Sequence, residues 1–265
     1  MRWVFYLALI YDKPMKTNMH LAHYFRYIWE RPNLIVVTGE AGEIWKGYDS
    51  YSKHYGIPKF DRKSTEMLGR LFAAAGLAAV SLPDAEWWGW SVTFPRLTTG
   101  LFCGVEPSGM VCGTVLESDP SRNLVAVQRQ AKNSPVTQSR FSLITHDPVE
   151  AIERYFEESE QTLIRIAVDN EGRGVLLRPL PGGSFDEIDG LTDDGLIDLC
   201  FKMAADEKIK RLDETLLFYE CPCDTEQIVK MLESLPENQR KELWGDLDML
   251  EVSCPRCGRK YNITR

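Results

Sequence analysis

Apolar residues follow two periods along the chain, one typical of strands and one typical of helices. Strand-like runs flank Pro32-Asn33 and recur between residues 92 and 127, where Pro and Gly turns separate them. Helical spacing occurs in 44–51 and again after Asp147-Pro148, where an acidic cap, a proline in the first turn and a glutamate three residues after the cap mark a helix start. Further strands are predicted at 162–168 and 172–180. The pattern predicts an α+β core.

The segment 64–80 is predicted to be the central helix of this core. Ser64 is its candidate N-cap, and apolar residues then occupy nearly every side of the helix. Such a helix is buried all round, and its Ala and Gly residues let neighbouring elements come close. Because Arg70 interrupts a run that is already short, we do not expect it to span a membrane.

Three tryptophans lie close together at positions 87, 88 and 90. Aromatic side chains of this size are usually buried, so we favour packing in the core or against an edge strand. An exposed adhesive patch is the alternative.

Charge is unevenly distributed along the chain. The net charge is −8, which argues against a nucleic-acid-binding surface as the main function. Residues 185–216 contain ten acidic side chains and four basic ones, and we interpret this segment as a metastable, partly helical linker that depends on docking against its neighbours. The predicted organisation is an N-terminal sheet-and-helix core domain (1–184), an acidic linker (185–216) and a small C-terminal zinc-binding domain (217–265).

Residues 1–16 are harder to assign. They are predicted to be either an edge strand or an over-long start, with true initiation at Met15 or Met19. The apolar run from Trp3 to Ile10 is too short to cross a bilayer and lacks a small-residue cleavage pattern, so no signal peptide and no membrane association are expected.

Four of the seven cysteines form two close pairs near the C-terminus, Cys221-Pro222-Cys223 and Cys254-Pro255-Arg256-Cys257. Two such pairs, about thirty residues apart, are typical of one tetrahedral zinc site in which each pair donates two thiolates from a tight turn. The prediction is one Zn²⁺ per chain, bound by Cys221, Cys223, Cys254 and Cys257. Four buried, reduced cysteines without a metal are the alternative.

The residues between the two pairs are predicted to fold around this ion. Asp224 with Gln227 forms a capping-box arrangement, Pro236 suits the first turn of a second helix, and Leu250 with Val252 alternates as a strand. A unit of about fifty residues buries too little surface to be stable alone. We therefore expect its stability to depend on the metal, which contributes about 10–16 kcal/mol in zinc-folded peptides.

Oxidation of the same sulfurs would compete with the metal. Sulfurs in a tetrahedral zinc site lie about 3.8 Å apart, whereas a disulfide requires about 2.05 Å. Because the cysteines of each pair are already tethered, Cys221 can close on Cys223 and Cys254 on Cys257, and each closure removes two of the four ligands.

These features resemble those of the heat shock protein 33 family of redox-regulated holdase chaperones. The two cysteine pairs, with Gly258 and Tyr261 after them, match that family's zinc switch, and independent similarity lies in Tyr155–Gln161, Gly174–Gly182 and Leu68–Leu71. The similar region extends from about His20 to Thr264. Asp224 in place of the usual serine and the lack of an evident Gly-Asp-Gly-Pro-like turn near Phe94–Leu97 are departures from the family pattern.

The resemblance implies a reduced, zinc-bound, inactive form. Oxidation would join Cys221 with Cys223 and Cys254 with Cys257, expel zinc, and unfold the zinc unit and the linker. The product would be a homodimer that holds unfolding client proteins without ATP. Such proteins function in the cytoplasm, and the cysteine usage agrees, since a secreted disulfide scaffold is usually shorter and pairs its cysteines more evenly.

Two other function classes remain open from the residues. One is a zinc module that binds RNA or a protein partner constitutively, although stacking aromatics are scarce near its basic end. The other is a thiol oxidoreductase using Cys254 and Cys257, which would need a reactive cysteine at a helix start. Phosphate-binding loops are absent and the four histidines show no ligand spacing, so we predict no enzymatic activity and no nucleic-acid binding.

Overall fold

We analysed a computed structural model, which describes residues 19–82 and 85–264. The predictions for residues 1–16 lie outside the described residues. Within the described part of the chain, no helix is both long and apolar enough to cross a membrane.

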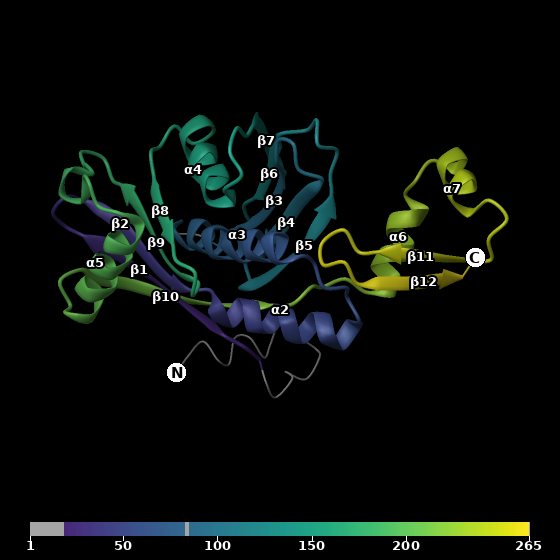
Figure 1. Ribbon diagram of the computed structural model, residues 1–265, viewed down its shortest axis with the longest axis horizontal. Helices are drawn as coiled ribbons and strands as arrows, with labels where there is room; N and C mark the ends of the chain where they lie inside the picture. Colours follow the sequence, from purple (N-terminus) through teal and green to yellow (C-terminus); the bar gives the residue numbers. More distant parts are fainter. Residues whose placement is uncertain (1–18, 83–84, 265) are drawn as a thin grey trace.

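A ten-stranded sheet runs through the main body of the molecule (Figure 1). Its strands follow the spatial order β7-β6-β3-β4-β5-β10-β1-β2-β9-β8. Neighbours are antiparallel except for β5 and β10, which pair in parallel over two residues and thereby join the two halves of the sheet. The strands are β1 (Ala22–Trp29), β2 (Leu34–Glu40), β3 (Trp87–Thr93), β4 (Thr99–Val105), β5 (Met110–Glu117), β6 (Leu124–Gln130), β7 (Thr137–Ser142), β8 (Arg165–Val168), β9 (Arg173–Pro179) and β10 (Lys210–Tyr219).

Helix α3 (Arg62–Val80) lies against both halves of this sheet, as its apolar circumference predicts. Leu68, Leu71 and Leu77 are completely buried. Around α3 lie α2 (Gly42–Tyr55) and α4 (Pro148–Glu158), and Asp147 caps α4 as predicted, its carboxylate accepting from the Val149 N–H. The prediction of a mixed sheet-and-helix core is confirmed.

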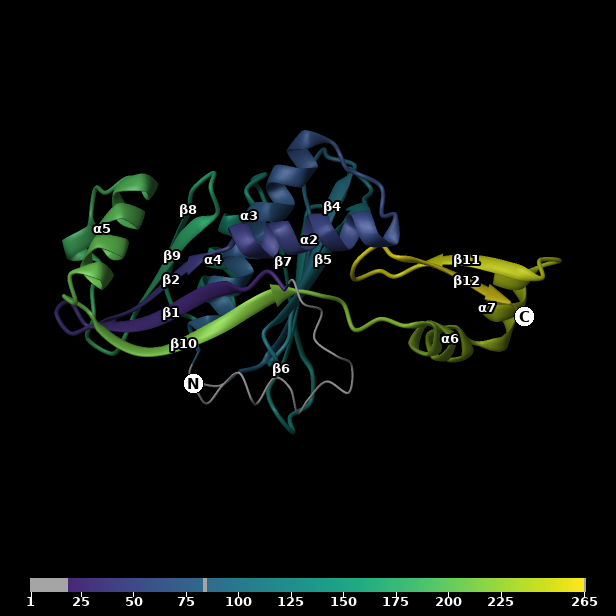
Figure 2. The ribbon, with the colours of Figure 1, turned by 90° about the horizontal axis from the view of Figure 1, so that it is seen from below.

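A smaller core lies on the opposite face of β2 and β9, under α5 (Asp193–Ala205). Alternation along β2 explains the two cores: Leu34 and Val36 face α5, while Ile35 and Val37 belong to the main core. Figure 2 shows α5 at the end of the molecule that is farthest from the C-terminal residues.

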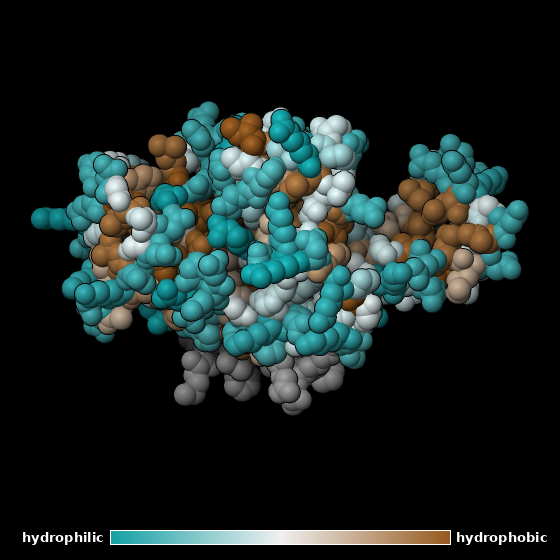
Figure 3. Space-filling view, viewed as in Figure 1, coloured by the Kyte–Doolittle hydropathy of each residue, from teal (hydrophilic) through white to brown (hydrophobic). Residues whose placement is uncertain are grey.

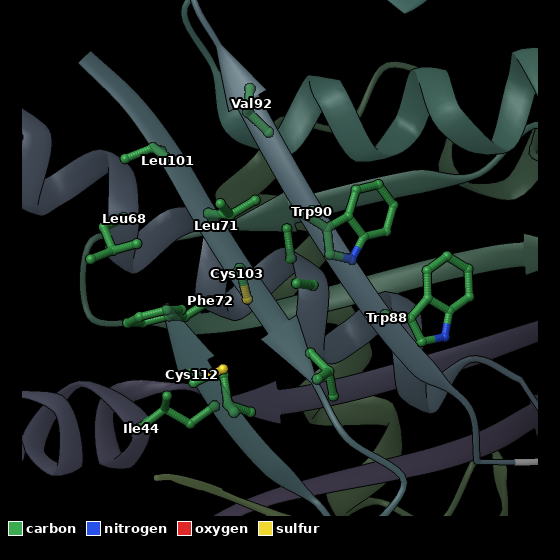
Figure 4. Close-up of a cluster of buried hydrophobic side chains, with 14 of the residues drawn as sticks. Ile44, Leu68, Leu71, Phe72, Trp88, Trp90, Val92, Leu101, Cys103 and Cys112 are labelled. Carbon is green, nitrogen blue, oxygen red and sulfur yellow. The ribbon is translucent and has the colours of Figure 1, made fainter. Parts of the chain in front are cut away.

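The tryptophan cluster belongs to the main core. Trp88 and Trp90 on β3 are fully buried, and their rings stack with centroids 5.4 Å apart (Figure 4). The core interpretation is therefore confirmed for these two side chains, while Trp87 is half-buried at the strand start.

Three predicted boundaries were wrong. Asp61, not Ser64, caps α3, because the Asp61 carboxylate accepts from the Ser64 N–H at 3.0 Å and Ser64 lies inside the first turn. Strand β8 begins at Arg165 rather than at residue 162, because its pairing with β9 starts at Arg165, opposite Leu177, and the Thr162 N–H donates instead to the Phe156 carbonyl of α4. Pro236 is the residue that precedes the second helix of the C-terminal unit, not a residue of its first turn.

The structure shows no separate acidic linker, although it describes all of residues 185–216. They form a short 3-10 turn, η1 (Asp186–Ile188), then α5 and most of β10. Strand β10 is accommodated beside β1 because Arg26 pairs with Asp213 and His23 with Glu214, so basic groups on β1 offset its acidic side chains. Metastability of this segment stays a prediction.

After β10 the chain forms a small unit at one end of the long axis (Figure 1), and we call residues 220–264 the cysteine module. It contains α6 (Thr225–Glu233), α7 (Glu237–Trp244) and a hairpin of β11 (Met249–Ser253) and β12 (Lys260–Thr264). Asp224 caps α6 through the Gln227 N–H at 2.8 Å, as predicted. Strand β12 was not predicted.

Candidate metal centre

The structure brings together the four cysteines that the sequence singles out. The Sγ atoms of Cys221, Cys223, Cys254 and Cys257 all lie within 4.8 Å of one another, and the Cys223 and Cys257 sulfurs are 3.5 Å apart. None of the four residues is more than 8 % exposed. This cluster could hold a metal ion.

Backbone geometry sets the second pair in a tight turn between β11 and β12. The Gly258 N–H donates to the Cys254 carbonyl and the Cys254 N–H to the Arg259 carbonyl, both at 2.8 Å. Gly258 has a φ of 79°, a conformation that glycine adopts without strain. A Cβ at this position would also lie only 3.0 Å from the Thr114 hydroxyl oxygen, so glycine lets the turn pack closely against β5. The first pair instead follows directly from β10.

Two tyrosines contribute hydroxyl groups to the cluster. Tyr261 on β12 donates to the Cys223 carbonyl at 2.8 Å and lies 3.1 Å from its Sγ. Tyr51 on α2 places its hydroxyl 3.6 Å from the Cys257 Sγ and 4.0 Å from the Cys223 Sγ. Burial raises the pKa of both phenols, so each stays protonated and can donate to a thiolate.

The sulfurs also act on one another. A hydrogen bond with Cys221 is the main cause that lowers the pKa of the Cys254 thiol to about 7. Hydrogen bonds with Cys221, Cys254 and Cys257 lower the pKa of Cys223 as well. Hydrogen bonds with Cys112 and with the other sulfurs of the cluster raise the pKa of Cys221, and the pKa of Cys257 is raised as well. The cluster thus shares its protons, and because metal ligation requires thiolates, binding of a cation by all four sulfurs would release them.

The donor set fits zinc. Four sulfurs with no carboxylate or open position among them are typical of a structural site, and a Zn–S bond of about 2.3 Å implies sulfurs about 3.8 Å apart. The 3.5 Å separation of Cys223 and Cys257 and the 4.8 Å limit on the group are compatible with that tetrahedron. That the ion is zinc stays a prediction.

The cluster lies where the cysteine module meets the core. The Arg256 guanidinium, between the cysteines of the second pair, forms an ion pair with Glu106 at the end of β4. The Arg259 guanidinium lies 3.9 Å above the Tyr55 ring and 4.8 Å from the Tyr261 ring. Figure 1 shows the closed end of the hairpin directed at the core beside α2 and β5.

Sequence reasoning missed the core side of this site. Tyr51 and Glu106 lie 206 and 150 residues from their partners Cys257 and Arg256, so no local pattern connects them. Cys112 on β5, which no spacing in the sequence connects to the cluster, is fully buried, and a hydrogen bond with it is the main cause that raises the pKa of Cys221.

Known proteins similar to this chain share one name. The family model described as Hsp33 protein matches residues 42–264. The 33 kDa chaperonin of Streptococcus equi subsp. equi is 29 % identical over 165 residues, which is 53 % of this chain and 57 % of the relative. The 33 kDa chaperonin of Lactobacillus delbrueckii subsp. bulgaricus is 35 % identical over 88 residues, or 33 % of this chain and 29 % of the relative. The match to the streptococcal protein thus spans little more than half of that relative's length.

The fold agrees with the sequence comparison. The crystal structure of the 33 kDa chaperonin from Thermotoga maritima superposes with a TM-score of 0.66 at 16 % identity, and the match covers 93 % of this chain and 95 % of that one. The relatives are named chaperonins rather than enzymes, in agreement with the predicted lack of enzymatic activity. With a family model that covers the chain from α2 to β12 and includes all four clustered cysteines, this protein belongs to the Hsp33 family.

Proposed function

We propose that this protein is a redox-regulated, ATP-independent holdase chaperone. In the reduced state Cys221, Cys223, Cys254 and Cys257 would hold one zinc ion, and the protein would be inactive. In the oxidised state two disulfides would replace the metal site, and the protein would bind unfolding client proteins and prevent their aggregation. The observation that carries the proposal is the buried cluster of four sulfurs in two tethered pairs.

The proposed oxidation pairs neighbours in sequence, Cys221 with Cys223 and Cys254 with Cys257. In each closure two thiols lose two electrons and two protons to one hydroperoxide, whose O–O bond breaks. The products are one disulfide, one water and one alcohol, or two waters when the oxidant is hydrogen peroxide. Bound zinc supplies only the attraction that keeps the four thiolates together, and each disulfide removes two of those thiolates.

The packing of the cysteine module supports a large structural response to this chemistry. Its helices bury few apolar side chains: Ile228 and Leu232 on α6, and Trp244 on α7. These pack with Leu250, Tyr261 and Ile263 around the cysteines. Loss of the cluster would therefore remove the main constraint on the unit and expose this small core.

Exposure of apolar surface is what a holdase needs to bind an unfolding protein. The module already carries exposed apolar side chains, and Figure 3 shows brown surface gathered on it; they are Met231, Leu243, Leu247 and Met249. Unfolding would join this surface to the released core residues. We propose that clients bind there, and that residues 185–216 loosen together with the module.

Two further properties belong to the same proposal. The oxidised form would be a homodimer, which sedimentation of the reduced and oxidised protein would test. A reducing cytoplasm would keep the cysteines free until oxidative stress, in agreement with the seven free cysteines of the structure.

The test is an aggregation assay on a thermally unfolding protein, with reduced and with peroxide-treated chaperone, alongside a colorimetric zinc assay. We expect about one zinc per reduced chain, and protection from aggregation only after zinc has left. Equal protection in both states would support a constitutive binding module instead. No protection in either state would contradict the chaperone function.

A further inference from the structure

Cys112 on β5 is a fifth cysteine beside the cluster. Strand β10 pairs with β5 in parallel, with Tyr219 opposite Val111, and the Glu220 N–H donates to the Val111 carbonyl at 2.9 Å. In this register Glu220 lies opposite Cys112, and Cys221 follows directly, just beyond the end of β10. The first cysteine of the cluster is therefore one residue out of register with Cys112 on the neighbouring chain.

The spacing of the two chains is suitable for a disulfide. Neighbouring strands lie about 4.8 Å apart and the chain rises about 3.3 Å per residue, so Cα atoms one residue out of register lie about 6 Å apart. Disulfides usually join Cα atoms about 4.4–6.8 Å apart. The two thiols also act on each other's pKa: the Cys221 side chain lowers the pKa of Cys112, and the Cys112 side chain raises the pKa of Cys221. Cys103, the other buried cysteine of this half of the sheet, lies on β4, one strand farther from β10.

The space above Gly104, which has no side chain, is shared by the Cys112 thiol and by Arg256 of the cysteine module. Gly104 is the cross-strand partner of Cys112, and a Cβ at position 104 would lie 3.2 Å from the Cys112 Sγ and 3.4 Å from an Arg256 guanidinium nitrogen. The missing side chain thus leaves the space in which Arg256 reaches Glu106 and passes the Cys112 thiol. Cys112 consequently touches both halves of the cluster region, through Cys221 and through Arg256.

We propose that Cys112 is a redox-active thiol that forms a disulfide with Cys221 when a hydroperoxide oxidises the cluster. This inference rests on the proposed redox function and adds a fifth cysteine to it. The Cys221 thiolate attacks the peroxide oxygen, the O–O bond breaks, and Cys221 becomes a sulfenic acid. The alkoxide, or hydroxide from hydrogen peroxide, leaves and takes a proton from water. The Cys112 sulfur then attacks the sulfenic sulfur, the S–O bond breaks, and the oxygen leaves as water with the Cys112 proton.

The consequence is a form of the protein that is oxidised but still tethered. A Cys112–Cys221 bond fastens the end of β10 to β5, while it removes one ligand from the cluster and leaves Cys254 and Cys257 free to pair. It competes with the Cys221–Cys223 bond for the same sulfur. The core would then control how far unfolding spreads from the cysteine module into β10.

The experiment is a tryptic digest of the peroxide-treated full-length protein under non-reducing conditions, analysed by mass spectrometry. Cys103 and Cys112 lie together in peptide 97–122, and Cys221 and Cys223 in peptide 212–230. We expect these two peptides to be cross-linked. Cyanogen bromide cleavage after Met110 separates Cys103 from Cys112, and fragmentation at the Cys221–Pro222 bond assigns the partner.

Two variants make the assignment independent of fragmentation. Cys112→Ser should lose the cross-linked peptide, whereas the matched control Cys103→Ser, equally buried, should retain it. The wild-type digest decides the question even if a variant folds poorly.

The same digest separates this inference from the proposed function. Peptide 242–256 joined to peptide 257–259 reports the Cys254–Cys257 disulfide. If that disulfide forms and zinc leaves, but peptides 97–122 and 212–230 stay separate or are joined through Cys103, the role of Cys112 is overturned and the switch stands. If neither product forms on oxidation, both proposals are wrong.

Discussion

The sheet core and the cysteine module achieve order in different ways. In the core, α3 buries twelve of its nineteen residues against both halves of the sheet. In the module, α6 buries two of nine and α7 one of eight. The core relies on hydrophobic burial, whereas we propose that the module, which buries less, depends on its four sulfurs. A protein built this way can lose order in one part and keep it in the other.

The largest expected effect follows from removing the metal from the reduced protein with a chelator. Structural zinc contributes about 10–16 kcal/mol in metal-folded peptides, so the module should unfold while the core persists. Limited trypsin digestion measures this, because Lys230, Arg240 and Lys241 would become rapidly cleaved. Cleavage within α3 at the same rate would show that the two regions are not independent.

A substitution in the core should lower the stability of the core and leave zinc binding by the module unchanged. Leu71 on α3 is fully buried, so Leu71→Ala should destabilise the core by about 2–5 kcal/mol in urea unfolding. The folded variant should still bind one zinc per chain. The matched control is Leu243→Ala on the module surface, where the side chain is 44 % exposed and the expected change is under about 0.5 kcal/mol.

Removing the ion pair between the cysteine module and the core should have an intermediate effect. Arg256→Ala removes the ion pair with Glu106, whose side chains are 28 % and 19 % exposed, and should cost about 1–2 kcal/mol of docking free energy. We expect faster release of zinc by peroxide, measured colorimetrically. The charge swap Arg256→Glu with Glu106→Arg should recover part of the wild-type rate; no recovery would mean that the ion pair is not the relevant contact.

The smallest effect should come from the cap of α6. Asp224→Ala removes the acceptor for the Gln227 N–H and should destabilise the zinc-loaded module by about 1 kcal/mol, seen as a lower midpoint for its thermal transition. The core transition should not move. Glu226→Ala is the control, because its exposed pair with Lys230 contributes little. Equal shifts for the two variants would argue against the cap.

Local signals in the sequence were enough for elements whose causes lie within one segment. Asp147, Pro148 and Glu150 predicted the start of α4, and the apolar circumference of 64–80 predicted the buried helix, with its cap misplaced by three residues. The spacing of the cysteines predicted the cluster, because close pairs can reach one ion whatever folds between them.

Features that depend on distant partners could not be predicted. The acidic residues before Leu216 suggested a linker, yet Asp213 is held in β10 by Arg26, 187 residues away. Likewise, Cys112 lies within a strand-like sequence that gives no sign of a link to the cluster. Only the short parallel pairing of β5 with β10 places Cys112 and Cys221 on neighbouring chains. Pairings between remote segments are set by the whole fold and leave no local periodicity.

Hydrogen–deuterium exchange, with zinc measured on the same samples, tests most directly whether the four sulfurs hold the module together. The reduced, zinc-loaded protein should protect the amides of α6, β11 and β12, and peroxide should abolish that protection as zinc leaves, while α3 stays protected. A module that keeps both its metal and its protection after thorough oxidation would contradict the account.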